Sequence, residues 1–131
     1  EAEPENWGDR VFRIDRIPQK NLAGLYQHCE AFIRTDPDDH TAITTLEAMA
    51  AGAPILAPRT AAIAEIAGNT PIYFNPDNQD SLMGVLRRVH QMPQDERQRR
   101  NALGKQTAQE FTWERCANQV LKALRRAAEA K

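Results

Sequence analysis

The sequence predicts an α/β protein with a doubly wound parallel sheet of about four strands, flanking helices and a helical C-terminus. Two observations predict this class. Short apolar segments alternate with amphipathic segments of helical period, and turn residues such as Gly52, Gly68 and those at 75–77 separate them. The composition, 41% hydrophobic and 27% charged residues in a chain of 131, is that of one ordinary globular domain.

Strands are expected where short apolar runs are bounded by polar or turn residues. Four runs meet this description, at 11–14, 31–34, 54–57 and 72–74.

Helices are expected between and after these strands. Pro18 suits a first helical turn, Gly52 suits the left-handed residue that ends a helix, and Thr112 is an expected N-cap. Helical spacing places Leu46 and Met49 on the side that faces the sheet. The expected ranges are about 18–29, 41–51, 60–67, 80–91, 94–109 and 112–130.

The first ten residues are polar and acidic without periodicity, which indicates a tail or linker remnant before a domain at 11–131. No apolar run approaches the roughly 20 residues that span a bilayer, and the N-terminal residues do not resemble a signal peptide. We therefore expect a cytoplasmic protein.

Cys29 and Cys116 lie in amphipathic segments without Cys-x-x-Cys spacing, so we expect buried free thiols and no disulfide. Isolated histidines at 28, 40 and 90 suggest no metal site, and we expect neither a metal nor another cofactor.

Charge is divided unevenly along the chain. Residues 1–83 hold 6 basic and 13 acidic side chains, whereas 84–131 hold 11 and 5. The basic helices lack interleaved aromatic residues, which argues against nucleic acid as a partner. Solvated helix faces or a weak membrane-surface contact remain as explanations.

The most informative segment is 35–52, in which a strand leads through an acidic loop to a helix N-terminus. Ligands of open α/β sheets bind at the carboxyl ends of strands, and a helix N-terminus there suits a phosphate. Thr41, Thr44 and Thr45 add hydroxyl groups near this end. Glu47 lies about 9 Å farther along the axis, roughly the distance between a diphosphate and a ribose, so its carboxylate could accept both ribose hydroxyls. On spacing alone, Asp39 and Glu47 could equally be ordinary surface acids.

Four motifs favour the ligand-binding interpretation of Asp39 and Glu47 over that of ordinary surface acids. Leu46 to Ala57 reads L-E-A-M-A-A-G-A-P-I-L-A, and it is followed by Glu65 in A-E-I-A-G, by F-N-P-D at 74–77 and by F-T-W-E at 111–114. Together they resemble the donor-domain signature of family-4 (group 1) retaining glycosyltransferases, whose GT-B fold has two Rossmann-like domains. The resemblance covers about residues 11 to 130 in the family's order and implies that this chain is part of the C-terminal, nucleotide-sugar-binding half.

The resemblance also implies roles for single residues. Glu47 matches the carboxylate that binds the ribose, and Asp39, where most members have Glu, matches the catalytic-site acid beside the donor sugar. The family's Gly-Phe-Gly is replaced by His40-Thr41-Ala42, and His40 could either bond the sugar or obstruct it. The implied donor-binding residues are Glu47, His40, Thr41, Ala42, Ile43 and Thr44.

The family's donor domain starts with two further strands and a glycine-rich turn with a basic pair that holds the diphosphate, and the sequence shows no counterpart of these. Lys20 follows a different strand and is expected to be an ordinary surface lysine. We therefore expect a partial donor site that is inactive without an N-terminal acceptor domain. The alternative is a non-catalytic nucleotide-sugar-binding or interaction module that completes a split enzyme.

In the usual strand order 3-2-1-4-5-6, the segments at 11–14 and 31–34 would be separated by two strands. Segment 31–34 should then have an unpaired edge, and a homodimer through this edge is expected.

Overall fold

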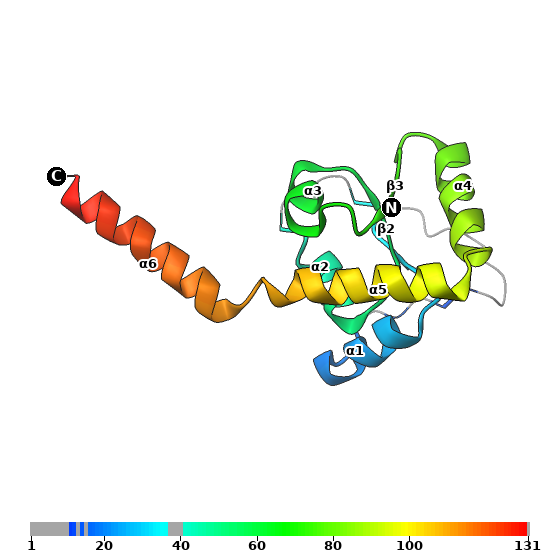
Figure 1. Cartoon of the computed structure of the whole chain (residues 1–131), viewed down its shortest axis with the longest axis horizontal. Helices are drawn as coiled ribbons and strands as arrows, with labels where there is room; N and C mark the ends of the chain where they lie inside the picture. The colour runs from blue at the N-terminus through cyan, green and yellow to red at the C-terminus, as the bar shows by residue number, and fades with distance from the viewer. Residues whose placement is uncertain (1–10, 13, 15, 37–40, 131) are drawn as a thin grey trace.

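The computed structural model describes residues 11–12, 14, 16–36 and 41–130. Within these ranges the chain alternates strands and helices before ending in three successive helices (Figure 1). The strands are β1 (Phe32–Ile33), β2 (Ile55–Pro58) and β3 (Ile72–Phe74). The helices are α1 (Gln19–His28), α2 (Ile43–Ala51), α3 (Ala61–Ala67), α4 (Gln79–His90), α5 (Gln94–Gln109) and α6 (Trp113–Glu129).

The predicted α/β class is confirmed, with a three-stranded parallel sheet in the order β1-β2-β3. Phe32 lies opposite Ile55, and Leu56 lies opposite Ile72. The central strand β2 is buried along its whole length, as expected for a parallel strand covered on both faces.

The fourth predicted strand, at 11–14, is wrong for the residues that the structure describes. Val11, Phe12 and Ile14 are exposed and belong to no strand. An apolar run becomes a strand only when another strand supplies hydrogen-bond partners, and none of the described strands lies beside this one.

Side chains alternate between two cores along β2 because successive strand residues point to opposite faces. Ile55 and Ala57 pack with α2, α3 and the Ala108 end of α5. Leu56 packs on the other face with Phe74 and with Val89 of α4. Met49 is fully buried and Leu46 partly buried on the α2 side, as predicted.

The helix ends predicted at Gly52 and Thr112 are confirmed, whereas Pro18, predicted in the first turn of α1, lies just before the helix as its N-cap residue. The hydroxyls of Thr60 and Thr112 accept backbone N–H bonds at the N-termini of α3 and α6, and the Asn78 side chain does the same for α4. Gly52 ends α2 with φ at 87°, in the left-handed region predicted for it.

Both cysteines are free thiols, as expected, but their predicted burial is wrong for Cys116. Cys29 is half-buried and its Sγ donates to the carbonyl of Tyr26, 3.2 Å away. Cys116 is exposed because it lies on α6, which extends away from the body of the domain (Figure 1).

We predict opposite effects for two Gly→Ala substitutions. Gly52→Ala should lower the free energy of unfolding by about 1–2 kcal/mol, because an L-residue is strained at positive φ. The new methyl would meet only the flexible end of Lys105, so backbone strain is the main cost. Gly84→Ala, in α4 with no heavy atom within 4 Å of the new Cβ, should raise it by about 0.5–1 kcal/mol. Urea unfolding measures both values, and equal effects would contradict the role given to Gly52.

Candidate nucleotide-binding groove

The carboxyl end of β1 and the N-terminus of α2 lie at the same end of the domain. The backbone N–H of Arg34, the residue after β1, donates to Leu56 O at 2.8 Å, so β2 fixes its position. Asp39 and His40, predicted to lie beside the donor sugar, are outside the described residues. Their roles stay predictions.

Helix α2 begins two residues later than predicted. Ala42 is its N-cap, with φ at 49° in the left-handed region, and its side chain is fully buried and provides no capping oxygen. Thr41 therefore precedes the helix and Ile43 is its exposed first residue. Ala42 occupies the place of the second glycine in the resembled Gly-Phe-Gly, and the left-handed backbone explains why glycine suits that place.

Arg34 brings a positive charge to the first turn of α2. Its Nη1 donates to Thr44 Oγ1 at 2.8 Å, and its Nη2 forms an ion pair with Asp36 at 3.3 Å. The Arg34 side chain is only 20% exposed. A guanidinium beside the positive end of a helix dipole favours anionic groups nearby. Thr45, also in this turn, is fully buried and faces the core.

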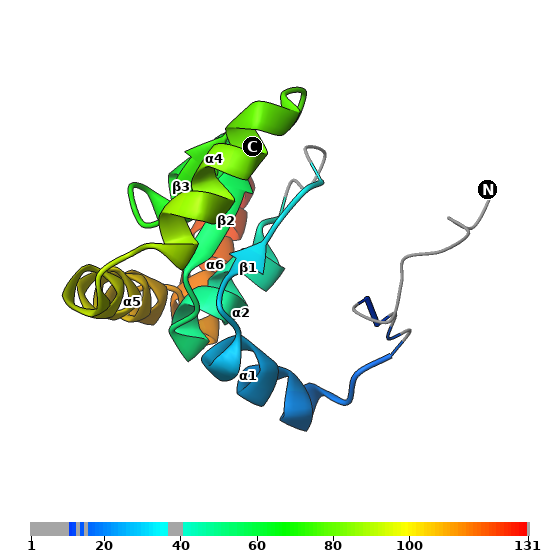
Figure 2. The same ribbon diagram turned by 90° about the vertical axis from the view of Figure 1, so that its right-hand side faces the viewer.

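Glu47 lies one turn farther along α2 and faces α1 rather than the sheet. Its Oε1 accepts a hydrogen bond from Gln19 Nε2 at 3.2 Å. The two helices border a groove of about 330 Å³, and Figure 2 shows α1 lying alongside α2. The side chains that line the groove come from both helices: Gln19, Leu22, Ala23, Tyr26, Gln27, Glu47, Ala50 and Ala51.

Tyr26 contributes both an apolar wall and an ionisable group to this groove. Its ring packs edge-on against Phe32, with ring centroids 5.4 Å apart. Burial raises the pKa of the Tyr26 phenol above its ordinary value, and the negative charge of Glu47 raises it further, while Arg34 opposes both effects. The groove is thus a mainly apolar surface with one carboxylate at its wall.

The structure brings Glu47 together with residues that sequence reasoning did not assign to the site, above all Gln19 and Tyr26. The sequence predicts a helix at about 18–29 but does not show which of its residues face Glu47. Arg34 was also missed, although a charged residue ending an apolar strand is a recognisable signal at the ligand-binding end of a sheet. Thr44 lies one helical turn before Glu47, and its hydroxyl accepts the hydrogen bond from Arg34. Lys20 is exposed on α1, as predicted.

Two further findings concern the described part of the chain only. No group of three or more His, Cys, Asp or Glu side chains there could hold a metal ion. None of its helices combines the length and apolar character needed to cross a bilayer.

The structure is an open α/β domain with a candidate ligand site formed by the N-terminus of α2 and the groove between α1 and α2. Comparison with known proteins identifies the family. The model of the glycosyl transferases group 1 family matches residues 1–110, and the chain belongs to this family.

Two curated relatives are mannosyltransferases. O-antigen chain mannosyltransferase B of Escherichia coli is 25% identical over 123 residues, which cover 92% of this chain and 31% of that protein. O-antigen chain mannosyltransferase RfbU of Salmonella typhimurium strain LT2 is 26% identical over 85 residues, covering 65% of this chain and 24% of that protein. The chain thus spans at most about a third of the length of these relatives. No solved structure matches the chain significantly.

We predict that Glu47→Gln lowers the pKa of Tyr26 but leaves it above 10.0, because burial is the larger cause of the shift. Tyr73, whose pKa is raised by burial and opposed by Arg59, is the internal control and should not respond. NMR titration of the ring signals measures both. Both phenols have a higher pKa in the folded chain than in the unfolded chain, so their neutral forms stabilise the fold. This stabilisation is fully present below pH 10.0 and is lost as the pH rises through the folded-state pKa values. An unchanged Tyr26 pKa would show that Glu47 does not face the phenol.

Proposed function

We propose that the chain is part of the donor-binding half of a retaining glycosyltransferase and that the groove between α1 and α2 binds the nucleoside of a nucleotide-sugar donor. The observation that supports this most is the placement of Glu47 in the wall of an apolar groove. A carboxylate can accept hydrogen bonds from both ribose hydroxyls. Leu22, Ala23 and the Tyr26 ring offer the apolar surface that a nucleobase requires.

The diphosphate is proposed to lie at the N-terminus of α2. The dipole of the helix favours an anion there, and Ala42 supplies no side-chain oxygen that would compete for the first-turn N–H groups. Arg34 adds a guanidinium that already contacts Thr44 of this turn. In this proposal Arg34 provides part of the positive charge that a basic pair provides in other members of the family.

The proposed sugar is mannose, on the strength of the names of both relatives. Asp39 is the proposed acid beside the sugar, with His40 as its neighbour. The acceptor is proposed to be a glycan, and the reaction transfers the sugar with retention of anomeric configuration, as the family resemblance implies.

A second candidate is a non-catalytic module that binds the nucleotide sugar or completes a split enzyme. The replacement of the family's Gly-Phe-Gly by His40-Thr41-Ala42 favours considering it. The length of the parent reading frame separates the candidates, because two such domains require about 350–400 residues.

We predict weak binding of a nucleoside diphosphate at this site. Titration with GDP, UDP or ADP should shift the amide signals of residues 41–47 together with those of Gln19 and Tyr26. Glu47→Ala should weaken binding by about tenfold, the loss of a charge-assisted hydrogen-bond pair. Glu129→Ala removes an exposed carboxylate from α6 and is the matched control, which should bind like the unchanged chain. Absence of shifts at millimolar nucleotide, or equal losses in the two variants, would contradict the proposal.

We also predict that the 131-residue chain alone neither transfers nor hydrolyses a nucleotide-linked mannose. Stabilisation of the departing diphosphate is a dominant catalytic requirement, and Arg34 with one helix end supplies only part of it. An enzyme-coupled assay that measures released nucleoside diphosphate tests this prediction. Release above background that Glu47→Ala abolishes would show that the chain is a complete catalyst.

A further inference from the structure

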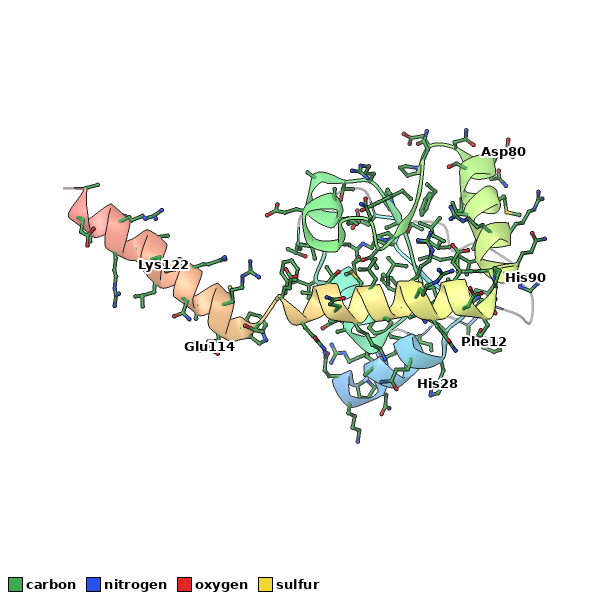
Figure 3. The ribbon with its side chains drawn as sticks, viewed as in Figure 1. Phe12, His28, Asp80, His90, Glu114 and Lys122 are labelled. Atoms are coloured by element: carbon green, nitrogen blue, oxygen red, sulfur yellow. The ribbon has the colours of Figure 1, made fainter. Side chains whose placement is uncertain are left out.

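The Glu47 carboxylate is held by a residue of the neighbouring helix. Gln19 Nε2 donates to Glu47 Oε1 at 3.2 Å, and this bond joins the first residue of α1 to α2 at the wall of the groove. In Figure 3 the label His28 marks the C-terminal end of α1, and Gln19 begins the helix at its other end. The contact is therefore made between two helices and not within one.

Helix α2 by itself offers the Glu47 carboxylate no amide or cationic side chain. On a helix, the side chains three and four positions away are the ones within reach. For Glu47 these are Ile43, Thr44, Ala50 and Ala51. The two alanines also line the groove, and a methyl group is too short to hold a glutamate side chain in one rotamer. The orientation of the carboxylate consequently depends on α1.

The start of α1 fixes the position of the Gln19 amide. Pro18 precedes it as the N-cap residue, and the Pro18 carbonyl accepts the Asn21 N–H at 2.8 Å. Because the proline ring restricts φ, this helix start has little backbone freedom. Farther along α1, the Tyr26 ring packs edge-on against Phe32 of β1. The amide is thus presented to the groove by a helix that is anchored to the sheet.

Hydrogen-bond chemistry allows Gln19 and a ribose to use the same carboxylate. An ionised carboxylate only accepts hydrogen bonds, so the nitrogen of the Gln19 amide, and not its oxygen, must face Glu47. The two carboxylate oxygens together offer about four lone-pair directions, and one N–H uses one of them. Room remains for both hydroxyls of a ribose, whereas a 2′-deoxyribose can supply only one of these bonds.

We propose that Gln19 is a positioning residue that holds the Glu47 carboxylate toward the groove, and that this pair selects ribonucleotides over 2′-deoxyribonucleotides. The inference rests on the proposed function, because it requires that Glu47 binds the ribose. A carboxylate that is already oriented loses less side-chain entropy on binding than one that must first be ordered. Loss of Gln19 therefore weakens the ribose contact but not the contact of a diphosphate with the N-terminus of α2.

A double-mutant cycle on the 131-residue chain tests this role, with GDP, UDP and ADP and their 2′-deoxy forms as probes. Gln19→Leu should weaken binding of the preferred ribonucleotide by about threefold to fivefold, the cost of ordering one side chain. It should also reduce the difference between that nucleotide and its 2′-deoxy form. In a Glu47→Ala chain, the same change should have no further effect. Pyrophosphate, which lacks a ribose, should bind equally to every chain of the cycle.

Gln94 provides the matched control. It is exposed and begins α5 directly after Pro93, the N-cap residue, just as Gln19 begins α1 after a proline. Gln94→Leu therefore makes the same change in the same local structure on another helix, and it should bind all probes like the unchanged chain. Gln19→Glu keeps the size of the side chain but brings a second acceptor to the carboxylate, so it should lose the selectivity as Gln19→Leu does.

The Tyr26 phenol reports the position of the carboxylate without any ligand. Burial raises the pKa of Tyr26 most, the charges of Glu47 and Cys29 raise it further, and Arg34 lowers it. If Gln19 holds the carboxylate in the groove wall, Gln19→Leu lets it turn toward solvent and lowers the pKa of Tyr26. The control variant should leave this pKa unchanged, and NMR titration of the ring signals measures it.

The outcomes separate this inference from the proposed function. An unchanged pKa of Tyr26 in Gln19→Leu would overturn the positioning role, and so would binding losses of Gln19→Leu and Glu47→Ala that simply add. The proposed function would survive either result as long as Glu47→Ala still weakened nucleotide binding. If Glu47→Ala bound nucleotides like the unchanged chain, the proposed function would be wrong and the role of Gln19 with it.

Discussion

Burial of β2 on both faces is the constraint on which the rest of this domain depends. Ile55, Leu56 and Ala57 are all almost inaccessible to solvent, so the strand needs hydrogen-bonding neighbours on both edges and helices on both faces. β1 and β3 satisfy its edges, while α2 and α4 cover its two sides. Parallel pairing in turn requires a crossover helix between successive strands, and α2 and α3 are those crossovers.

The same helix that covers β2 also forms the candidate site. Ala48 and Met49 bury one side of α2 against the sheet, and their neighbour Glu47 consequently faces α1. The N-terminus of α2 is held near the end of β1 by Arg34, whose backbone is bonded to β2 and whose side chain reaches Thr44. Packing of the core therefore sets the spacing between the proposed diphosphate and ribose positions.

Local sequence signals predicted the features that depend on local chemistry. The strand at 72–74 and the N-cap Thr112 were confirmed as predicted, because turn residues bound the first and a hydroxyl defines the second. The strand at 11–14 was wrong because strand formation depends on a partner elsewhere in the sheet. The burial of Cys116 was wrong for a similar reason: amphipathicity defines an apolar face on α6 but not what covers it. The approach of Gln19 and Tyr26 to Glu47 depends on how two helices pack, which no motif encodes, and Asp39 stays a prediction.

The proposed function depends most on contact between Glu47 and a ribose in the groove between α1 and α2. Isotope-filtered NOE spectroscopy of the labelled chain with an unlabelled nucleoside diphosphate tests this contact most directly. If Glu47 binds the ribose, NOEs should connect the ribose protons to the side chains of Glu47 and Tyr26, and they should be lost in Glu47→Ala. Ribose NOEs confined to residues outside this groove, in a complex whose nucleotide is bound, would contradict it.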